Sequence, residues 1–131
     1  MTHPLRILLV EDNVVNQKVA SKLLERLGYQ ADIVSNGIEA LQALRQNPYD
    51  VVLMDMYMPE MDGITTAQRI YEEWHPVIRP RIIAITASTE DEDRAACMAA
   101  GMDDYISKPL RLEELKRVLM SGDANHFCSC S

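Results

Sequence analysis

The sequence predicts an α/β fold in which five parallel strands form one doubly wound sheet, in the order 2-1-3-4-5, with helices on both faces. Three observations support this prediction. Short runs rich in β-forming residues alternate five times with helix-length amphipathic segments, which is typical of parallel sheets. Three of the runs are almost continuously apolar, as expected for strands that are buried on both faces. The polar residues that interrupt the pattern lie where strands end.

The five expected strands differ in their pattern of apolar residues. The first, third and fourth consist almost entirely of Ile, Leu, Val and Met, which favours the interior of the sheet. The second alternates polar and apolar residues, which indicates an edge strand. The expected ranges are Leu5 to Val10, Gln30 to Val34, Val51 to Met54, Ile82 to Thr86 and Tyr105 to Ser107.

The segments between and after the strands carry apolar residues at helical spacing. In the first segment, Val15, Val19, Leu23 and Leu27 recur every four residues, and Gly28 stands where a helix often ends in a left-handed residue. The later stripes are Ile38, Leu41 and Leu44, then Ile64, Ala67, Ile70, Tyr71 and Trp74, and finally Leu112, Leu115 and Leu119.

Capping signals and breakers mark where these later helices begin and end. Asn36 with Glu39, and Thr89 with Glu92, have the three-residue spacing of a capping box. The expected helix ends are Asn47-Pro48, the connector from His75 to Pro80, Gly101, and the region near Met120.

Length, composition and charge restrict the class of protein. A chain of 131 residues fits one domain, and its 47% of apolar residues can build a core without disulfides or metals. Thirteen basic against twenty acidic residues give a net charge of −7, which disfavours direct binding to nucleic acid. No apolar run approaches the roughly 18 to 20 residues of a membrane span, so we expect a cytoplasmic domain without membrane insertion.

The three cysteines do not suggest a disulfide framework. Cys97 falls in a helix-like segment, and Cys128 and Cys130 lie at the very end of the chain, so reduced thiols are expected. His126, Cys128 and Cys130 could together grip a metal. Because the tail is short and polar and offers no fourth ligand nearby, a flexible tail of residues 121–131 is the favoured interpretation.

Five polar residues are expected to meet at the carboxyl edge of the sheet. Glu11 and Asp12 follow the first strand, Asp55 follows the third, Thr86 closes the fourth and Lys108 follows the fifth. Ligands of open α/β sheets bind at this edge, where the strand order reverses between the first and third strands. Three carboxylates placed there repel one another by about 4 kcal/mol per pair at roughly 4 Å, so the site needs a cation or must protonate. An open, acidic site lined by oxygens suits Mg²⁺.

Asp55 then has two candidate roles. It is either a metal ligand only, or a nucleophile that takes a phosphoryl group and becomes an aspartyl phosphate. Lys108 and Thr86 favour the second role, because an ammonium group, a hydroxyl donor and a divalent ion are the groups that stabilise charge on a transferred phosphoryl group.

At these residues the sequence resembles the receiver domain of two-component response regulators. The matching stretches run in the right order through residues 5–120, which would form the receiver, with residues 1–4 as a linker or an added start. They are Leu8-Leu9-Val10-Glu11-Asp12-Asn13, Leu53-Met54-Asp55-Met56, Met58-Pro59-Glu60-Met61-Asp62-Gly63, Ile85-Thr86-Ala87 and Tyr105-Ile106-Ser107-Lys108-Pro109.

The resemblance implies a flavodoxin-like (βα)5 fold and a role for each site residue. Asp55 accepts the phosphoryl group, Glu11 and Asp12 hold Mg²⁺ directly or through water, and the backbone carbonyl of Tyr57 is a further ligand. Glu11 stands where Asp is usual, which lengthens the reach to the metal by one methylene.

The resemblance also implies a switch. Lys108 pairs with the phosphoryl group, Thr86 moves to hydrogen-bond it, and Tyr105 swings inward, which changes the surface of the fourth helix, fifth strand and fifth helix. A cis bond between Lys108 and Pro109 is expected as well.

Two stretches are similar to receivers that are fused to hybrid sensor histidine kinases and act in phosphorelays. They are Asp12-Asn13-Val14-Val15-Asn16-Gln17 and the run from Ala99 to Pro109. The implied partner is a histidine kinase or a histidine phosphotransfer domain. The chain itself is then no enzyme in the usual sense, but a phosphoacceptor that catalyses its own phosphotransfer and slow dephosphorylation. The side chains of Tyr57 and Ser88 are candidates to gate the water that removes the phosphoryl group.

Other interpretations stay open at this point. The domain could be a free-standing single-domain response regulator, and the sequence does not decide whether it forms a weak homodimer. A Mg²⁺-dependent phosphoesterase also places acids after parallel strands, but usually as Asp-x-Asp, whereas Tyr57 stands two residues after Asp55 here. A pseudo-receiver that binds partners without phosphorylation is disfavoured by the complete set of acids, Thr86 and Lys108.

Overall fold

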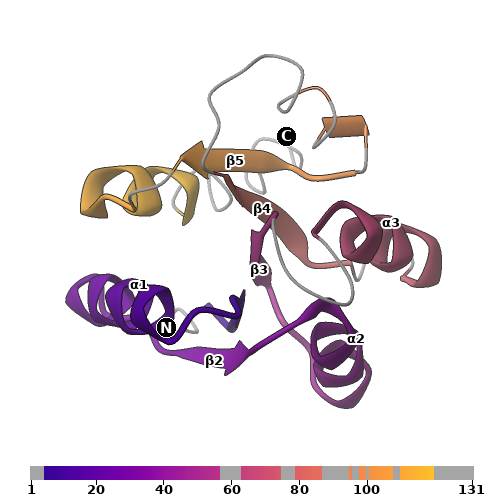
Figure 1. Cartoon of the computed structure of the whole chain (residues 1–131), viewed down its shortest axis with the longest axis horizontal. Coiled ribbons are helices and arrows are strands. Elements are labelled where there is room, and N and C mark those ends of the chain that lie inside the picture. The colour runs from indigo at the N-terminus through magenta and orange to yellow at the C-terminus, as the bar shows by residue number, and fades with distance from the viewer. Residues whose placement is uncertain are drawn as a thin grey trace, which may run out of the picture.

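The five-stranded sheet is the centre of the molecule. The computed structural model describes residues 5–56, 63–74, 79–86, 95, 98–99, 101–107 and 110–119. All strand pairs are parallel and the order is β2-β1-β3-β4-β5, which confirms the predicted topology (Figure 1). The strands are β1 (Ile7–Val10), β2 (Ala31–Val34), β3 (Val51–Asp55), β4 (Arg81–Thr86) and β5 (Asp104–Ser107).

Helices cover both faces of this sheet (Figure 1). The labelled helices are α1 (Val14–Arg26), α2 (Gly37–Gln46) and α3 (Gly63–Glu73). Residues 112–119 are also helical and are called the C-terminal helix below. One core cluster lies between the sheet and α2 with α3, and the second lies between the sheet and α1 with the C-terminal helix. Each face of the sheet therefore has its own apolar core, as expected for a doubly wound fold.

The strand boundaries differ from the sequence prediction by one or two residues. β1 begins at Ile7 rather than at Leu5, and β3 extends one residue further, so that Asp55 is its last residue. Asp55 is only 2% exposed, because it still belongs to the fully buried strand. The sequence pattern could not show this, since a carboxylate at a strand end usually belongs to a solvated loop.

The predicted apolar stripe of α1 is only partly buried. Val15 is 67% exposed and Val19 44% exposed, whereas Ala20 and Leu24 are buried against the sheet. Leu23 and Leu27 pack beside these two residues. Because Leu23 and Leu27 belong to both, the buried face is shifted around the helix from the predicted stripe by less than the roughly 100° between successive residues. The amphipathic pattern finds the helix, but it does not decide which edge of a wide apolar stripe meets the sheet.

The predicted helix ends are confirmed where the structure describes them. The side chain of Asn36 accepts a hydrogen bond from the Glu39 N–H (2.8 Å), and the Glu39 carboxylate accepts one from the Ser35 N–H (2.9 Å). α2 ends at Gln46 with Asn47 as its C-cap, and Gly28 follows α1 with φ +88°. A left-handed residue of this kind is accessible to Gly at little cost.

Several sequence expectations lie outside the described residues. They are the capping box of Thr89 and Glu92, most of the fourth helix, most of the connector from His75 to Pro80, the helix end near Met120, the linker 1–4 and the tail 121–131. None of the helices in the described part of the chain is long and apolar enough to cross a membrane.

Asp103, just before β5, makes two hydrogen bonds to Ile82 of β4, one through its N–H and one through its carboxylate. The Asp103 N–H donates to the Ile82 carbonyl (2.7 Å), and the Ile82 N–H donates to the Asp103 carboxylate (2.8 Å). We expect Asp103→Ala to lower the free energy of unfolding by about 1 to 3 kcal/mol, because the N–H of buried Ile82 loses its acceptor. Urea titration measures this loss. Asp103→Asn keeps an acceptor oxygen and should lose clearly less, so equal losses in the two variants would contradict the pairing.

Candidate functional site

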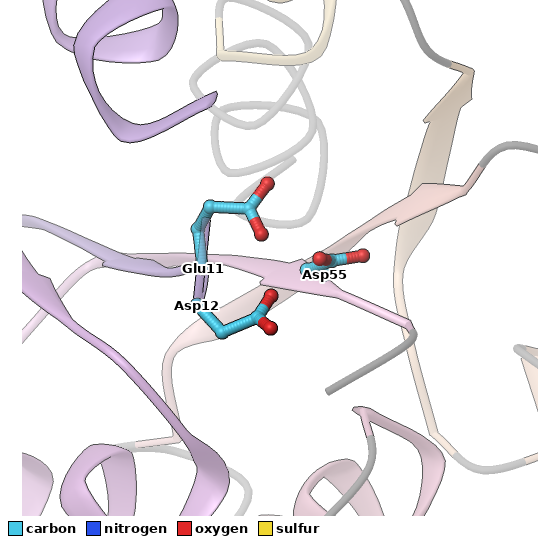
Figure 2. Close-up of side chains that lie close together, drawn as sticks. All are labelled: Glu11, Asp12 and Asp55. Carbon is cyan, nitrogen blue, oxygen red and sulfur yellow. The ribbon is translucent and has the colours of Figure 1, made fainter. Parts of the chain in front are cut away.

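Three carboxylates meet at the carboxyl edge of the sheet, as predicted. Glu11 and Asp12 directly follow β1, and Asp55 ends the neighbouring strand β3 (Figure 2). One oxygen atom from each side chain lies within 4.8 Å of the other two. Glu11 and Asp55 are buried, at 2% exposure each, and Asp12 is exposed. Two carboxylates of the site are thus buried, and the third is accessible to solvent.

Parallel pairing brings these residues together. β1 and β3 pair in register from Ile7 opposite Val51 to Val10 opposite Met54, so their carboxyl ends lie at the same level. The chain then turns from β1 into α1, and the turn begins with Glu11 and Asp12, whose side chains lie next to Asp55. This is the point where the strand order reverses, which is where open α/β sheets bind ligands.

The main chain of Glu11 is held from two elements. Its N–H donates to the carbonyl of Val34 at the end of β2 (3.0 Å), and its carbonyl accepts from the side-chain amide of Gln17 in α1 (2.7 Å). The Asn13 N–H lies 3.4 Å from a carboxylate oxygen of Glu11, which is a long contact. The turn that carries two of the three carboxylates is therefore fixed by neighbouring elements.

Asn13 begins the helix that follows this turn. Its side-chain oxygen accepts from the Asn16 N–H (3.1 Å), and its own carbonyl accepts the first helical bond, from the Gln17 N–H (2.9 Å). Sequence analysis did not assign roles to Asn13 or Gln17. The signal for Asn13 was available, because Asn before an apolar helical run is a common N-cap. The role of Gln17 depends on a contact between elements that no sequence spacing reveals.

Thr86 and Tyr105 lie on one face of the sheet, and Thr86 directly follows Ile85, the residue that pairs with Asp55. β4 and β5 pair with Ala84 opposite Tyr105 and Thr86 opposite Ser107, so the four side chains share one face. Thr86 is buried at the end of β4, and Tyr105 packs against the core under α2 and α3. The two residues that the family resemblance couples are thus close neighbours in adjacent strands.

Other predicted site residues lie outside the described residues. They are Tyr57, Ser88, Lys108 and Pro109, so the predicted Lys108 amine and the cis bond have no structural description.

The donor set suits a hard divalent cation. Three carboxylates at this spacing repel one another, and a cation between them removes that repulsion. All the donors are oxygens, and Asp12 is exposed to solvent. Mg²⁺ prefers one or two carboxylates together with waters or phosphate oxygens, so two of these three carboxylates would be enough to hold it.

Comparison with known proteins identifies the class that this fold and site define. Residues 7–120 match the family model of the response regulator receiver domain. The chain therefore belongs to the response regulator receiver domain family.

Individual relatives narrow the type of receiver. Hybrid signal transduction histidine kinase B of Dictyostelium discoideum is 41% identical over 120 residues, which cover 84% of this chain and 6% of that kinase. The chain spans between 5% and 15% of the length of this and comparable curated histidine kinases. It is thus homologous to the receiver domains of hybrid histidine kinases.

Two solved structures are similar to this chain and hold a bound ion or a partner protein of their own. The receiver domain of the sensor histidine kinase PA1611 from Pseudomonas aeruginosa, with a magnesium ion coordinated in its active site cleft, is 40% identical. Its TM-score is 0.82, with coverage of 91% of this chain and 97% of that chain. The receiver domain of Ssk1 from Saccharomyces cerevisiae, in complex with the histidine phosphotransfer protein Ypd1, is 26% identical with a TM-score of 0.79. The coverage is 88% of this chain and 86% of that chain.

Proposed function

We propose that this domain accepts a phosphoryl group on Asp55 from a partner's phosphohistidine and passes a signal within a phosphorelay. The observation that carries the proposal is the position of Asp55. Its carboxylate is buried at the end of β3, yet it lies within 4.8 Å of the carboxylates of Glu11 and Asp12. A carboxylate nucleophile beside a cation site suits phosphoryl transfer, because the ion offsets the charge on the transferred group.

The chemical step is an in-line displacement. A carboxylate oxygen of Asp55 attacks phosphorus, the bond between phosphorus and the imidazole nitrogen breaks, and that nitrogen keeps the electron pair. Glu11 and Asp12 would hold Mg²⁺ with Asp55, and the backbone carbonyl of Tyr57 would complete the protein ligands. The bound ion supplies positive charge to the phosphoryl oxygens. Lys108 and Thr86 add a cation and a hydroxyl donor to the same oxygens.

The phosphorylated state would be read through Thr86 and Tyr105. Their shared face gives a short path from the phosphoryl group to β5, since Thr86 and Tyr105 lie in adjacent strands. A new hydrogen bond to Thr86 would change the space available to the Tyr105 ring, and with it the surface of the fourth helix, β5 and the C-terminal helix. Driving such an equilibrium from 1:99 to 99:1 takes about 5.5 kcal/mol, which a few charge-assisted hydrogen bonds can supply.

The domain would catalyse its own phosphorylation and its slow dephosphorylation. Attack of water on the acyl phosphate resets the switch, with Tyr57 and Ser88 as the residues that gate this water. Replacing each in turn should change the dephosphorylation rate, and unchanged rates would remove the gating role. The parent chain would be a hybrid histidine kinase, with a free-standing response regulator as the alternative.

Labelling of the unaltered domain tests this function against its rivals. Incubation with radiolabelled acetyl phosphate should give a label that requires Mg²⁺ and is released by hydroxylamine, which cleaves acyl phosphates. A phosphoesterase would instead turn over a phosphoester without a trapped intermediate. A pseudo-receiver would take up no label from acetyl phosphate, with or without Mg²⁺.

The exposed valines of α1 favour a docking surface for the phosphohistidine partner. Val14, Val15 and Val19 are 59%, 67% and 44% exposed, and α1 starts two residues after Asp12. A partner that places phosphohistidine over Asp55 must cover this end of α1. An apolar patch beside the site would add affinity by burial of its side chains.

We expect Val15→Asp to slow phosphoryl transfer from a histidine phosphotransfer protein about tenfold or more, because a charge would enter an apolar interface. Phosphorylation by acetyl phosphate should stay unchanged, since a small donor needs no docking surface. Tyr71→Asp, at an exposed aromatic residue (54%) of α3 on the face of the sheet opposite α1, is the matched control and should slow neither reaction. Equal slowing with both donors would argue against docking at α1.

A further inference from the structure

We propose that Gln17 is a positioning residue for the metal site. Its side-chain amide holds the main chain of Glu11, so that the carboxylates of Glu11 and Asp12 stand ready beside Asp55. The inference rests on the proposed function only for the identity of the cation, and its test below measures binding separately from phosphoryl transfer.

The contact itself is short and directional. Nε2 of Gln17 lies 2.7 Å from the Glu11 carbonyl oxygen, at the short end of the range for N–H···O hydrogen bonds. A carbonyl only accepts, so the amide nitrogen must be the atom that faces it. The N–H of Glu11 donates to the Val34 carbonyl (3.0 Å), which ties Glu11 to β2. Glu11 is therefore clamped between an edge strand and a helix.

Gln17 can act as a clamp because its own position is fixed. Its backbone N–H makes the first helical hydrogen bond of α1, to the carbonyl of Asn13 (2.9 Å), and its side chain is half-buried. The Asn13 side chain in turn caps the Asn16 N–H (3.1 Å). Two side chains thus stabilise the turn from β1 into α1: Asn13 caps the helix, and Gln17 bonds back to the Glu11 carbonyl.

This geometry matters because the carboxylates repel one another. Without a cation, repulsion favours rotation of the Glu11–Asp12 turn away from Asp55, and the clamp opposes that movement. A ligand set held in place loses less conformational freedom when the ion binds. Groups that orient metal ligands commonly change metal affinity about 10- to 100-fold. Because Gln17 acts on the main chain rather than on a carboxylate, we expect an effect at the lower end of that range.

The decisive experiment compares Mg²⁺ affinity with the rate of phosphorylation. Gln17→Met keeps a side chain of similar length but removes the donor. Titration calorimetry with MgCl₂ should show a dissociation constant raised about 10- to 20-fold. The rate of phosphorylation by acetyl phosphate at saturating Mg²⁺ should stay within about twofold of the unaltered domain, because the filled site restores the geometry. Gln42→Met, at an exposed glutamine of α2, is the matched control and should change neither value.

A spectroscopic readout checks the clamp without metal. The Asp12 N–H belongs to the same peptide group as the Glu11 carbonyl, so its ¹H–¹⁵N resonance should shift in Gln17→Met and not in Gln42→Met. An unchanged dissociation constant in Gln17→Met would overturn the proposal, as would a slower rate at saturating Mg²⁺ with normal affinity. If Gln17→Met does not stay folded, Gln17→Ala replaces it, with the same outcomes.

Failure of the proposed function is distinguishable from failure of this inference. If the unaltered domain binds Mg²⁺ but takes up no phosphoryl group from any donor, the function is wrong while the affinity comparison still decides the role of Gln17. If the domain is labelled normally and the two Gln→Met variants bind Mg²⁺ equally well, the role of Gln17 is wrong and the function stands.

Discussion

Asp55→Asn is expected to abolish phosphorylation of this domain. An amide is no nucleophile at phosphorus. Of the three carboxylates, Asp55 is the one that ends β3, where it is buried. The rate of labelling by acetyl phosphate or by a phosphorylated histidine phosphotransfer partner should fall by roughly a thousandfold or more, as when a covalent nucleophile is removed. Radiolabel that resists hydroxylamine, or label that persists in the variant, would place the acceptor elsewhere.

The residue before the same strand supplies the matched control. Asp50 directly precedes β3, at the opposite edge of the sheet, and its carboxylate accepts a hydrogen bond from the Arg6 N–H (2.8 Å). Asp50→Asn also removes one negative charge, and its side-chain oxygen can still accept that bond. It should be labelled at the normal rate. Loss of labelling in both variants would point to a general effect of charge rather than to a nucleophile.

Leu53→Ala is expected to have the largest effect on stability. Leu53 is fully buried in β3, between β1 and β4, within the core that lies under α1 and the C-terminal helix. Removing its branched side chain leaves a cavity that a rigid sheet cannot close, which costs about 2 to 5 kcal/mol. Because domains of this size are stable by about 5 to 15 kcal/mol, this is a large share of the total. Urea or thermal unfolding followed by circular dichroism measures it.

A partly exposed aliphatic residue of the edge strand gives the comparison for that loss. Ile33 lies in β2 and is 40% exposed, so Ile33→Ala removes fewer buried contacts and should cost less than half as much. Equal losses would mean that the two strands contribute equally to the core, against the burial described above. Both variants should keep Mg²⁺-dependent labelling under conditions where they are folded.

Much of the architecture follows from local patterns. The continuous apolar runs of β1, β3 and β4 predicted interior strands, and the alternation of β2 predicted an edge, because burial on two faces or one imposes those patterns. The capping box at Asn36 and the left-handed Gly28 also depend on residues close in sequence. The meeting of Glu11, Asp12 and Asp55 was predictable for a different reason. Parallel strands place their carboxyl ends at one edge of the sheet, and these acids follow or end such strands.

Other features depend on how the elements pack. The stripe of α1 left several rotations of the helix open, and only packing against the sheet buried Ala20 and Leu24 while exposing Val15. The bridge between Gln17 and Glu11 joins a helix to a strand end, and its geometry depends on how α1 leaves the turn.

The sequence by itself determined the succession of strands and helices, the edge strand and the acidic residues of the site, because these are written in residue types and in spacing along the chain, and the strand order came with the family that its motifs resemble. Only the tertiary structure decided that Asp55 is the buried last residue of β3, which face of α1 meets solvent, and that Thr86 and Tyr105 share one face of the sheet. The physical reason is that burial and orientation are properties of packed neighbours, and those neighbours come from distant parts of the chain.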